Sequence, residues 1–83
     1  MWISVTKQDI QQGIPRKSSL CPIALAVKRR FPDLNIYVLP YGIFYRRTLL
    51  GVVSRPDQDK IADFINAFDQ RHTVNPFRFR LEV

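Results

Sequence analysis

The chain has 83 residues, 46% of them hydrophobic, with a formal net charge of +6 and one cysteine. This length is typical of one domain over residues 1–83, and the hydrophobic content argues against intrinsic disorder. A single cysteine excludes an internal disulfide and a cysteine-based zinc cage, and no apolar run approaches the ~18 residues of a membrane span. The sequence also shows no signal peptide, so we expect a cytoplasmic protein without membrane contact.

The first 17 residues predict a strand, one helical turn and a loop. Residues 2–6 alternate apolar and polar side chains, as in a half-buried strand. Thr6 to Asp9 has the form of a capping box, and Gly13 follows one turn later. Residues 14–17 then read as a loop.

The first long helix is expected to open at Ser18-Ser19. Pro22 falls in its first turn, where the missing amide hydrogen is not needed. Pro32 pushes the residue before it out of helical geometry and ends the helix. Apolar residues recur at helical spacing and predict a buried stripe. They are Leu20, Ile23, Ala24, Val27 and Phe31.

The middle of the chain predicts a hairpin. Residues 35–39 read as a strand, residues 40–42 as a turn and residues 43–48 as a second strand. Residues 49–53 form either a further strand joined tightly to it, or the end of one long strand bent near Gly51.

The last third predicts a helix and a closing strand. Ser54 to Asp57 forms a second capping box, and the helix that follows ends near Gln70. Residues 77–83 alternate apolar and charged side chains, so Phe77 to Val83 has one buried face and one solvated face that carries arginine.

These elements predict an α+β fold in the order β-α-β-β-(β)-α-β. Two helices would pack on one face of a small, mostly antiparallel sheet. The final strand is expected at a sheet edge, where another copy could pair with it, so a homodimer stays open.

Positive charge is concentrated in one part of the chain. Residues 10–56 contain eight basic side chains and one acid, Asp33, whereas residues 57–83 hold four bases and five acids. A lopsided field of this kind attracts anionic partners.

Three basic segments are candidates for contact with an anionic partner. Arg16-Lys17-Ser18 precedes a predicted helix N-terminus, which suits an anion, although serine there could act only as a cap. Residues 28–30 are basic in the last helical turn, where cations also complement the helix dipole. Tyrosines beside Arg46-Arg47 could stack on bases while the arginines pair with phosphates. The candidate binding residues are Arg16, Lys17, Ser18, Lys28, Arg29, Arg30, Tyr41, Tyr45, Arg46 and Arg47.

Catalysis has little support. His72 has no nucleophile nearby in the sequence, and Cys21 is better explained as a buried structural residue. The three isolated glycines match no phosphate-binding loop, and the acids of the second helix are too few and too solvated for a metal. We therefore expect no enzyme, no cofactor and no metal.

Two segments resemble a group of small uncharacterised proteins from phage and bacterial genomes. Residues 21–26 read Cys-Pro-Ile-Ala-Leu-Ala, and residues 64–81 close on Pro-Phe-Arg-Phe-Arg-Leu. The resemblance implies no activity, but it does imply a phage origin and hence the host cytoplasm.

We therefore expect a non-enzymatic protein that binds nucleic acid or a nucleotide. The alternative is a protein–protein inhibitor or adaptor that docks on an acidic surface of a host defence or transcription protein.

Overall fold

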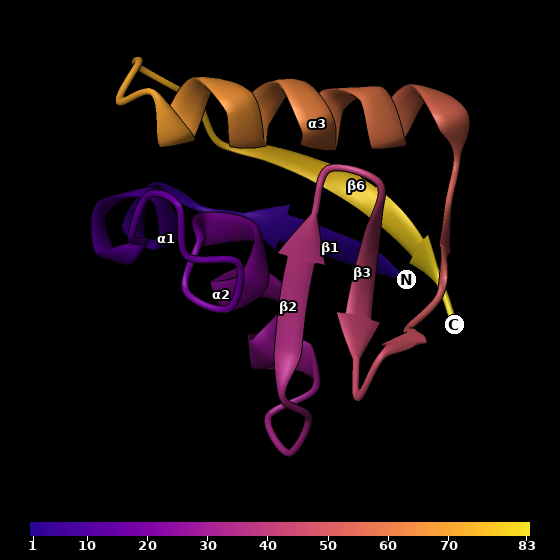
Figure 1. Ribbon diagram of the computed structural model, residues 1–83. Coiled ribbons are helices and arrows are strands. Elements are labelled where there is room, and N and C mark those ends of the chain that lie inside the picture. The colour runs from indigo at the N-terminus through magenta and orange to yellow at the C-terminus, as the bar shows by residue number, and fades with distance from the viewer.

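The computed structural model describes residues 1–83, which form three helices and six strands in one antiparallel α+β fold (Figure 1). The element order is β-α-α-β-β-β-β-α-β, so the predicted fold class is confirmed. The elements are β1 (Trp2–Val5), α1 (Lys7–Gln12), α2 (Pro22–Arg30), β2 (Ile36–Leu39), β3 (Gly42–Tyr45), β4 (Thr48–Leu49), β5 (Val52–Val53), α3 (Arg55–Asp69) and β6 (Phe77–Glu82).

The strands form two sheets rather than the one that the pattern predicts. One sheet has the order β1-β6-β5 and the other β2-β3-β4, with antiparallel pairing throughout. The chain leaves the second sheet after Leu49 and joins the first at Val52. Gly51 lies between them, and a Cβ there would stand 2.5 Å from the Glu82 carbonyl oxygen, so glycine permits the close passage that divides the strands.

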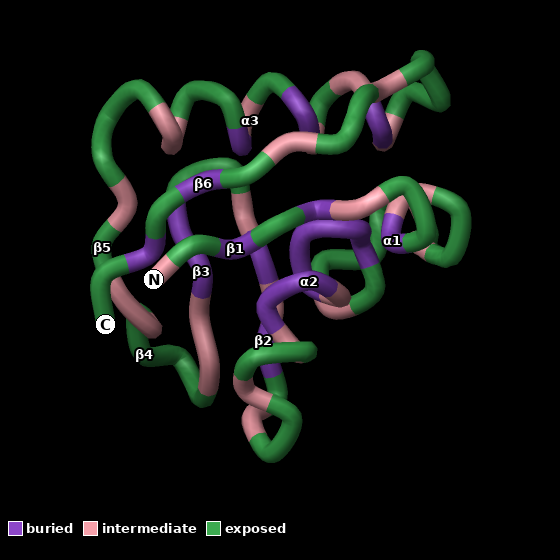
Figure 2. The backbone as a smooth tube through the Cα atoms, turned by 180° about the vertical axis from the view of Figure 1, so that it is seen from behind, coloured by how far each residue is buried: buried purple, intermediate pink, exposed green.

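Both sheets share one hydrophobic core (Figure 2). Ile3, Phe79 and Leu81 come from the first sheet, and Ile36 and Ile43 come from the second. Helix α2 contacts both β1 and β2, and α3 stacks its Phe64 and Phe68 rings beside β6. Because the inner faces of the two sheets meet this core, their outer faces point away from each other.

Helix α2 begins later than predicted. Its N-cap is Cys21, whose sulfur accepts a hydrogen bond from the Ala24 amide at 3.4 Å, and Pro22 is the first helical residue. Ser18 and Ser19 lie outside the helix because residues 14–20 close on themselves through a bond from the Ile14 amide to the Leu20 carbonyl. Leu20 is consequently exposed instead of buried.

The edges of the first sheet are β1 and the two-residue β5, and the final strand lies between them, so the predicted edge position of β6 is wrong. Arg30 donates to the carbonyl of Trp2, and Arg29 donates to the carbonyl of Ser4. Two guanidinium groups thus occupy acceptors that a further strand would use.

None of the three helices has the length and hydropathy of a membrane-spanning segment.

Candidate nucleic-acid interface

The three basic residues at the end of α2 are engaged within the fold. The Lys28 ammonium donates to the Ser19 carbonyl at 2.5 Å, and the Arg30 guanidinium donates to the Trp2 carbonyl at 3.2 Å. Arg29 forms two hydrogen bonds to the Asp9 carboxylate, at 2.9 and 2.8 Å. These cations join α2 to the preceding loop, β1 and α1, so the structure explains all three without an external anion.

Asp9 is the only buried charged residue. Burial alone raises the pKa of its carboxyl group, but hydrogen bonds from Arg29 and from Thr6 outweigh burial and hold that pKa below its usual value. The same contact raises the pKa of Arg29. The pair therefore stays ionised at neutral pH and links α1 to α2.

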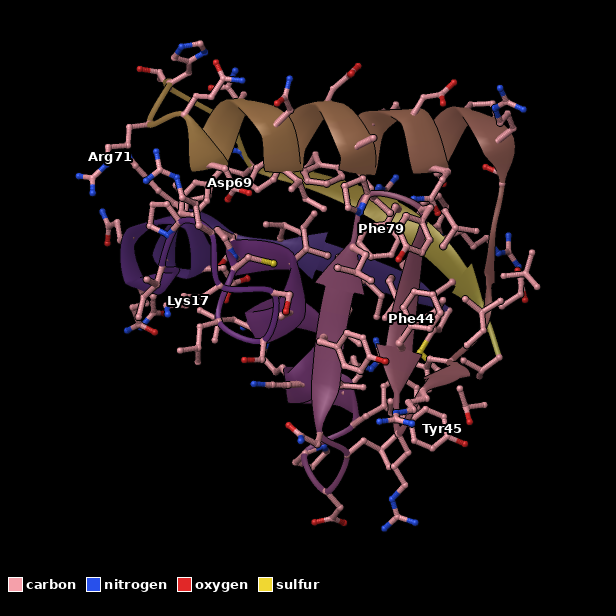
Figure 3. The ribbon with its side chains drawn as sticks, in the orientation of Figure 1. Lys17, Phe44, Tyr45, Asp69, Arg71 and Phe79 are labelled. Atoms are coloured by element: carbon pink, nitrogen blue, oxygen red, sulfur yellow. The ribbon has the colours of Figure 1, made fainter.

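Arg16, Lys17 and Ser18 line a pocket of about 290 Å³ together with Cys21 and Asp69. The Arg16 amide donates to the Asp69 carboxylate at 2.9 Å, and Lys17 and Asp69 lie on the same side of the molecule in Figure 3. The helix N-terminus offers few free donors here, because Pro22 lacks an amide hydrogen and Cys21 takes the Ala24 amide. The expected anion site at this helix end is therefore not formed, although both cationic side chains remain exposed.

This loop lies along the second sheet. The Ser18 carbonyl accepts a hydrogen bond from the Val38 amide of β2 at 2.9 Å, and the pocket also includes Leu39. The loop thus brings Arg16 and Lys17 next to the edge of β2.

The outer face of the second sheet is aromatic. Tyr37 pairs with Phe44 across β2 and β3, and Phe44 pairs with Leu49 of β4, so these side chains share one face. The Tyr37 and Phe44 rings stack with centroids 5.5 Å apart, and Tyr41 meets Phe44 edge-on at 5.9 Å. We call Tyr37, Tyr41 and Phe44 the aromatic face. Tyr41 is 72% exposed, whereas Tyr37 and Phe44 are half-buried.

Tyr41 and Tyr45, the two tyrosines predicted to stack on bases, do not adjoin. Tyr41 precedes β3 and Tyr45 ends it, so the strand separates them. Tyr45 pairs with Ile36 and packs, half-buried, against the core. The alternation of buried Ile36 and Val38 in β2 is the sequence signal that would have placed Tyr37 outward instead.

Arg46 and Arg47 form the turn between β3 and β4, where the sequence pattern predicts continuing strand. Tyr45 pairs directly with Thr48, and the backbone has φ of 48° at Arg46 and 64° at Arg47. A two-residue hairpin loop with positive φ at both positions is a type I′ turn, for which Asn-Gly is the favoured pair. Left-handed backbone costs a residue with a side chain roughly 1–2 kcal/mol. Both side chains are exposed and form no ion pair.

A second group of aromatic and basic side chains lies on the first sheet. The Arg78 guanidinium carbon stands 4.6 Å from the centre of the Trp2 ring, and that of Arg80 stands 5.9 Å away. The sequence pattern placed both arginines on a solvated face but did not connect them with Trp2, because the two ends of the chain meet only in the folded sheet.

The residues considered for catalysis are not assembled. His72 is exposed, and burial raises the pKa of the Cys21 thiol, which disfavours the reactive thiolate. No group of three or more histidine, cysteine or acidic side chains is arranged to hold a metal ion.

Comparisons with family models, with curated proteins and with solved structures found no match to this chain. The resemblance to small phage and bacterial proteins stays a prediction.

Proposed function

We propose that this protein binds a single-stranded nucleic acid on the aromatic face. The observation that carries the proposal is the half-buried Tyr37–Phe44 stack with the exposed Tyr41 ring beside it. Bases of a single strand can splay out and stack on such rings, whereas the bases of a duplex are already stacked. Each stacked base contributes about 1–3 kcal/mol to binding.

Cations border this face on two sides. Arg46 and Arg47 lie at the end of β3, and Arg16 and Lys17 lie along β2. Rings flanked by cations on an open sheet surface are typical of proteins that follow a nucleic-acid backbone. A free nucleotide fits less well, because no glycine-rich loop encloses its phosphates.

The backbone of the β3–β4 turn supports the same function. A turn built for stability alone would carry Asn-Gly, yet two arginines occupy its left-handed positions. Strain of this kind is characteristic of functional positions. We therefore assign Arg46 and Arg47 to phosphate contacts.

Fluorescence anisotropy with a labelled 15-nucleotide oligo(dT) tests the proposal. The variants Tyr37→Leu and Phe44→Leu keep apolar bulk but remove the ring, so each should weaken binding at least about fivefold. Phe77→Leu is the matched control, since Phe77 is also half-buried but lies on β6.

Affinity of the wild-type protein should fall as salt rises, with a log–log slope of about −0.7 for each phosphate neutralised. Unchanged affinity in both folded ring variants, or binding that does not depend on salt, would refute the proposal. Circular dichroism spectra verify that each variant is folded.

A further inference from the structure

Trp2 lies on the outer face of the first sheet among arginine side chains. Register places Trp2 opposite Arg80 and Ser4 opposite Arg78, so these four residues share one face. Trp2 is 48% exposed, and both guanidinium groups lie within reach of a cation–π contact with its ring. We call Trp2, Arg78 and Arg80 the tryptophan face.

This face has an excess of positive charge. Arg80 pairs with Glu82 at 2.7 Å, and Arg30 donates to the Trp2 carbonyl. Arg78 makes no ion pair. The four ion pairs of the structure are formed by other arginines and by Lys60. Two guanidinium groups therefore lie over one exposed indole, and a third bonds the backbone of the same residue. Glu82 is the one acid on the strand beside them.

The chemistry of these groups suits phosphate and bases. A guanidinium that lies against an aromatic ring keeps its in-plane N–H donors at the rim, where they can bind a phosphate with two hydrogen bonds. The indole adds a surface on which a base can stack. A carboxylate partner would use the same donors but would leave the exposed indole without a stacking partner.

We infer that the tryptophan face is a second nucleic-acid contact, distinct from the aromatic face. The two sheets turn their inner faces to one core, so these outer faces point away from each other. In Figure 1, β1 and β6 lie behind β2 and β3. One molecule can thus hold two nucleic-acid segments, or two parts of one long strand. This inference does not depend on the aromatic face binding anything.

Trp2 is the only tryptophan, so tryptophan emission, excited at a wavelength where the three tyrosines do not absorb, reports occupancy of this face. Titration with unlabelled 15-nucleotide oligo(dT) at low salt should quench Trp2 emission, and added salt should restore it. Arg78→Met and Arg80→Met keep the aliphatic stem and remove the charge. Each should weaken the quenching titration at least about threefold, as expected for one lost phosphate contact.

The double variant Tyr37→Leu/Phe44→Leu separates the two faces. It should weaken binding measured by anisotropy while the midpoint of Trp2 quenching stays unchanged. The inference is overturned if oligo(dT) does not quench Trp2, or if the double variant shifts the quenching and the arginine variants do not. Quenching by poly-glutamate that equals quenching by oligo(dT) would also overturn it and would assign the face to an acidic protein.

Discussion

Two Arg-Arg pairs occur in this chain, and the fold treats them in opposite ways. Arg29-Arg30 ends α2 and donates to the Asp9 carboxylate and to two carbonyls of β1. Arg46-Arg47 forms a hairpin turn with left-handed backbone and makes no ion pair. The first pair stabilises the fold, whereas the second is held in an unfavourable conformation with its charges free. Composition alone assigns both to the same basic surface.

The largest expected effect comes from Arg29→Met. Removal of the guanidinium leaves the Asp9 carboxylate buried without its partner, so we expect the free energy of unfolding to fall by about 2–4 kcal/mol. Urea denaturation measures the change. Arg47→Met is the matched control and should change stability by less than about 0.5 kcal/mol, as exposed substitutions usually do. An equal loss of unfolding free energy in Arg29→Met and Arg47→Met would show that the two Arg-Arg pairs do not differ in their contribution to stability.

The same contact predicts how stability depends on pH. The pKa of Asp9 is lowered in the folded state, so its contribution is complete above the usual aspartate pKa and is lost as pH falls through the folded value. Asp9→Asn removes this titration, so the stability of the variant should start lower and fall less steeply as the pH decreases. Circular dichroism during acid titration records both midpoints. An acid transition of the same shape in both proteins would exclude Asp9 as a source of acid sensitivity.

Replacement of the turn pair should separate stability from binding. Arg46→Asn with Arg47→Gly provides residues that tolerate left-handed backbone, and we expect a gain of about 1–2 kcal/mol in urea denaturation. The same variant loses two cations, so the log–log salt slope of oligo(dT) binding should shrink by about 1.4. If Arg46 and Arg47 do not contact phosphate, the variant would gain stability but the salt slope of oligo(dT) binding would stay unchanged.

The smallest effect is expected at Arg30. Its single bond to the Trp2 carbonyl is exposed, so Arg30→Met should cost less than about 1 kcal/mol, well below Arg29→Met. Urea denaturation of the two variants side by side gives the order. A larger loss at Arg30 would mean that the bond to β1, and not the ion pair with Asp9, is the main contact of the first pair.

Local patterns predicted most elements of the fold. The capping residues Thr6 and Ser54, the turn before Gly42 and the alternation in β6 all act within a few residues, and the structure contains them. The division into two sheets depends on the close passage of Gly51 past Glu82, residues 31 positions apart in the chain. Periodicity carries no signal for such a contact.

The candidate site was predicted only in part. The sequence indicates which arginines are present, but their partners lie far away, as when Arg29 meets Asp9 across 20 positions. Tyr37 could have been recognised from the alternation in β2, whereas the cluster of Trp2 with Arg78 requires the pairing of β1 with β6. Distant pairing therefore accounts for the missed contacts of Arg29 and Trp2, whereas Tyr37 was missed although a local pattern points to it.

The guanidinium groups on the β1 carbonyls also bear on how the chain behaves while it folds. An open strand edge can recruit the same strand from a neighbouring molecule, which is the first step toward fibrils. Here the edge is closed only when the last turn of α2 is in place. Any partly folded state that lacks that turn exposes the carbonyls of Trp2 and Ser4, so aggregation should depend on how often α2 frays and not on global unfolding alone.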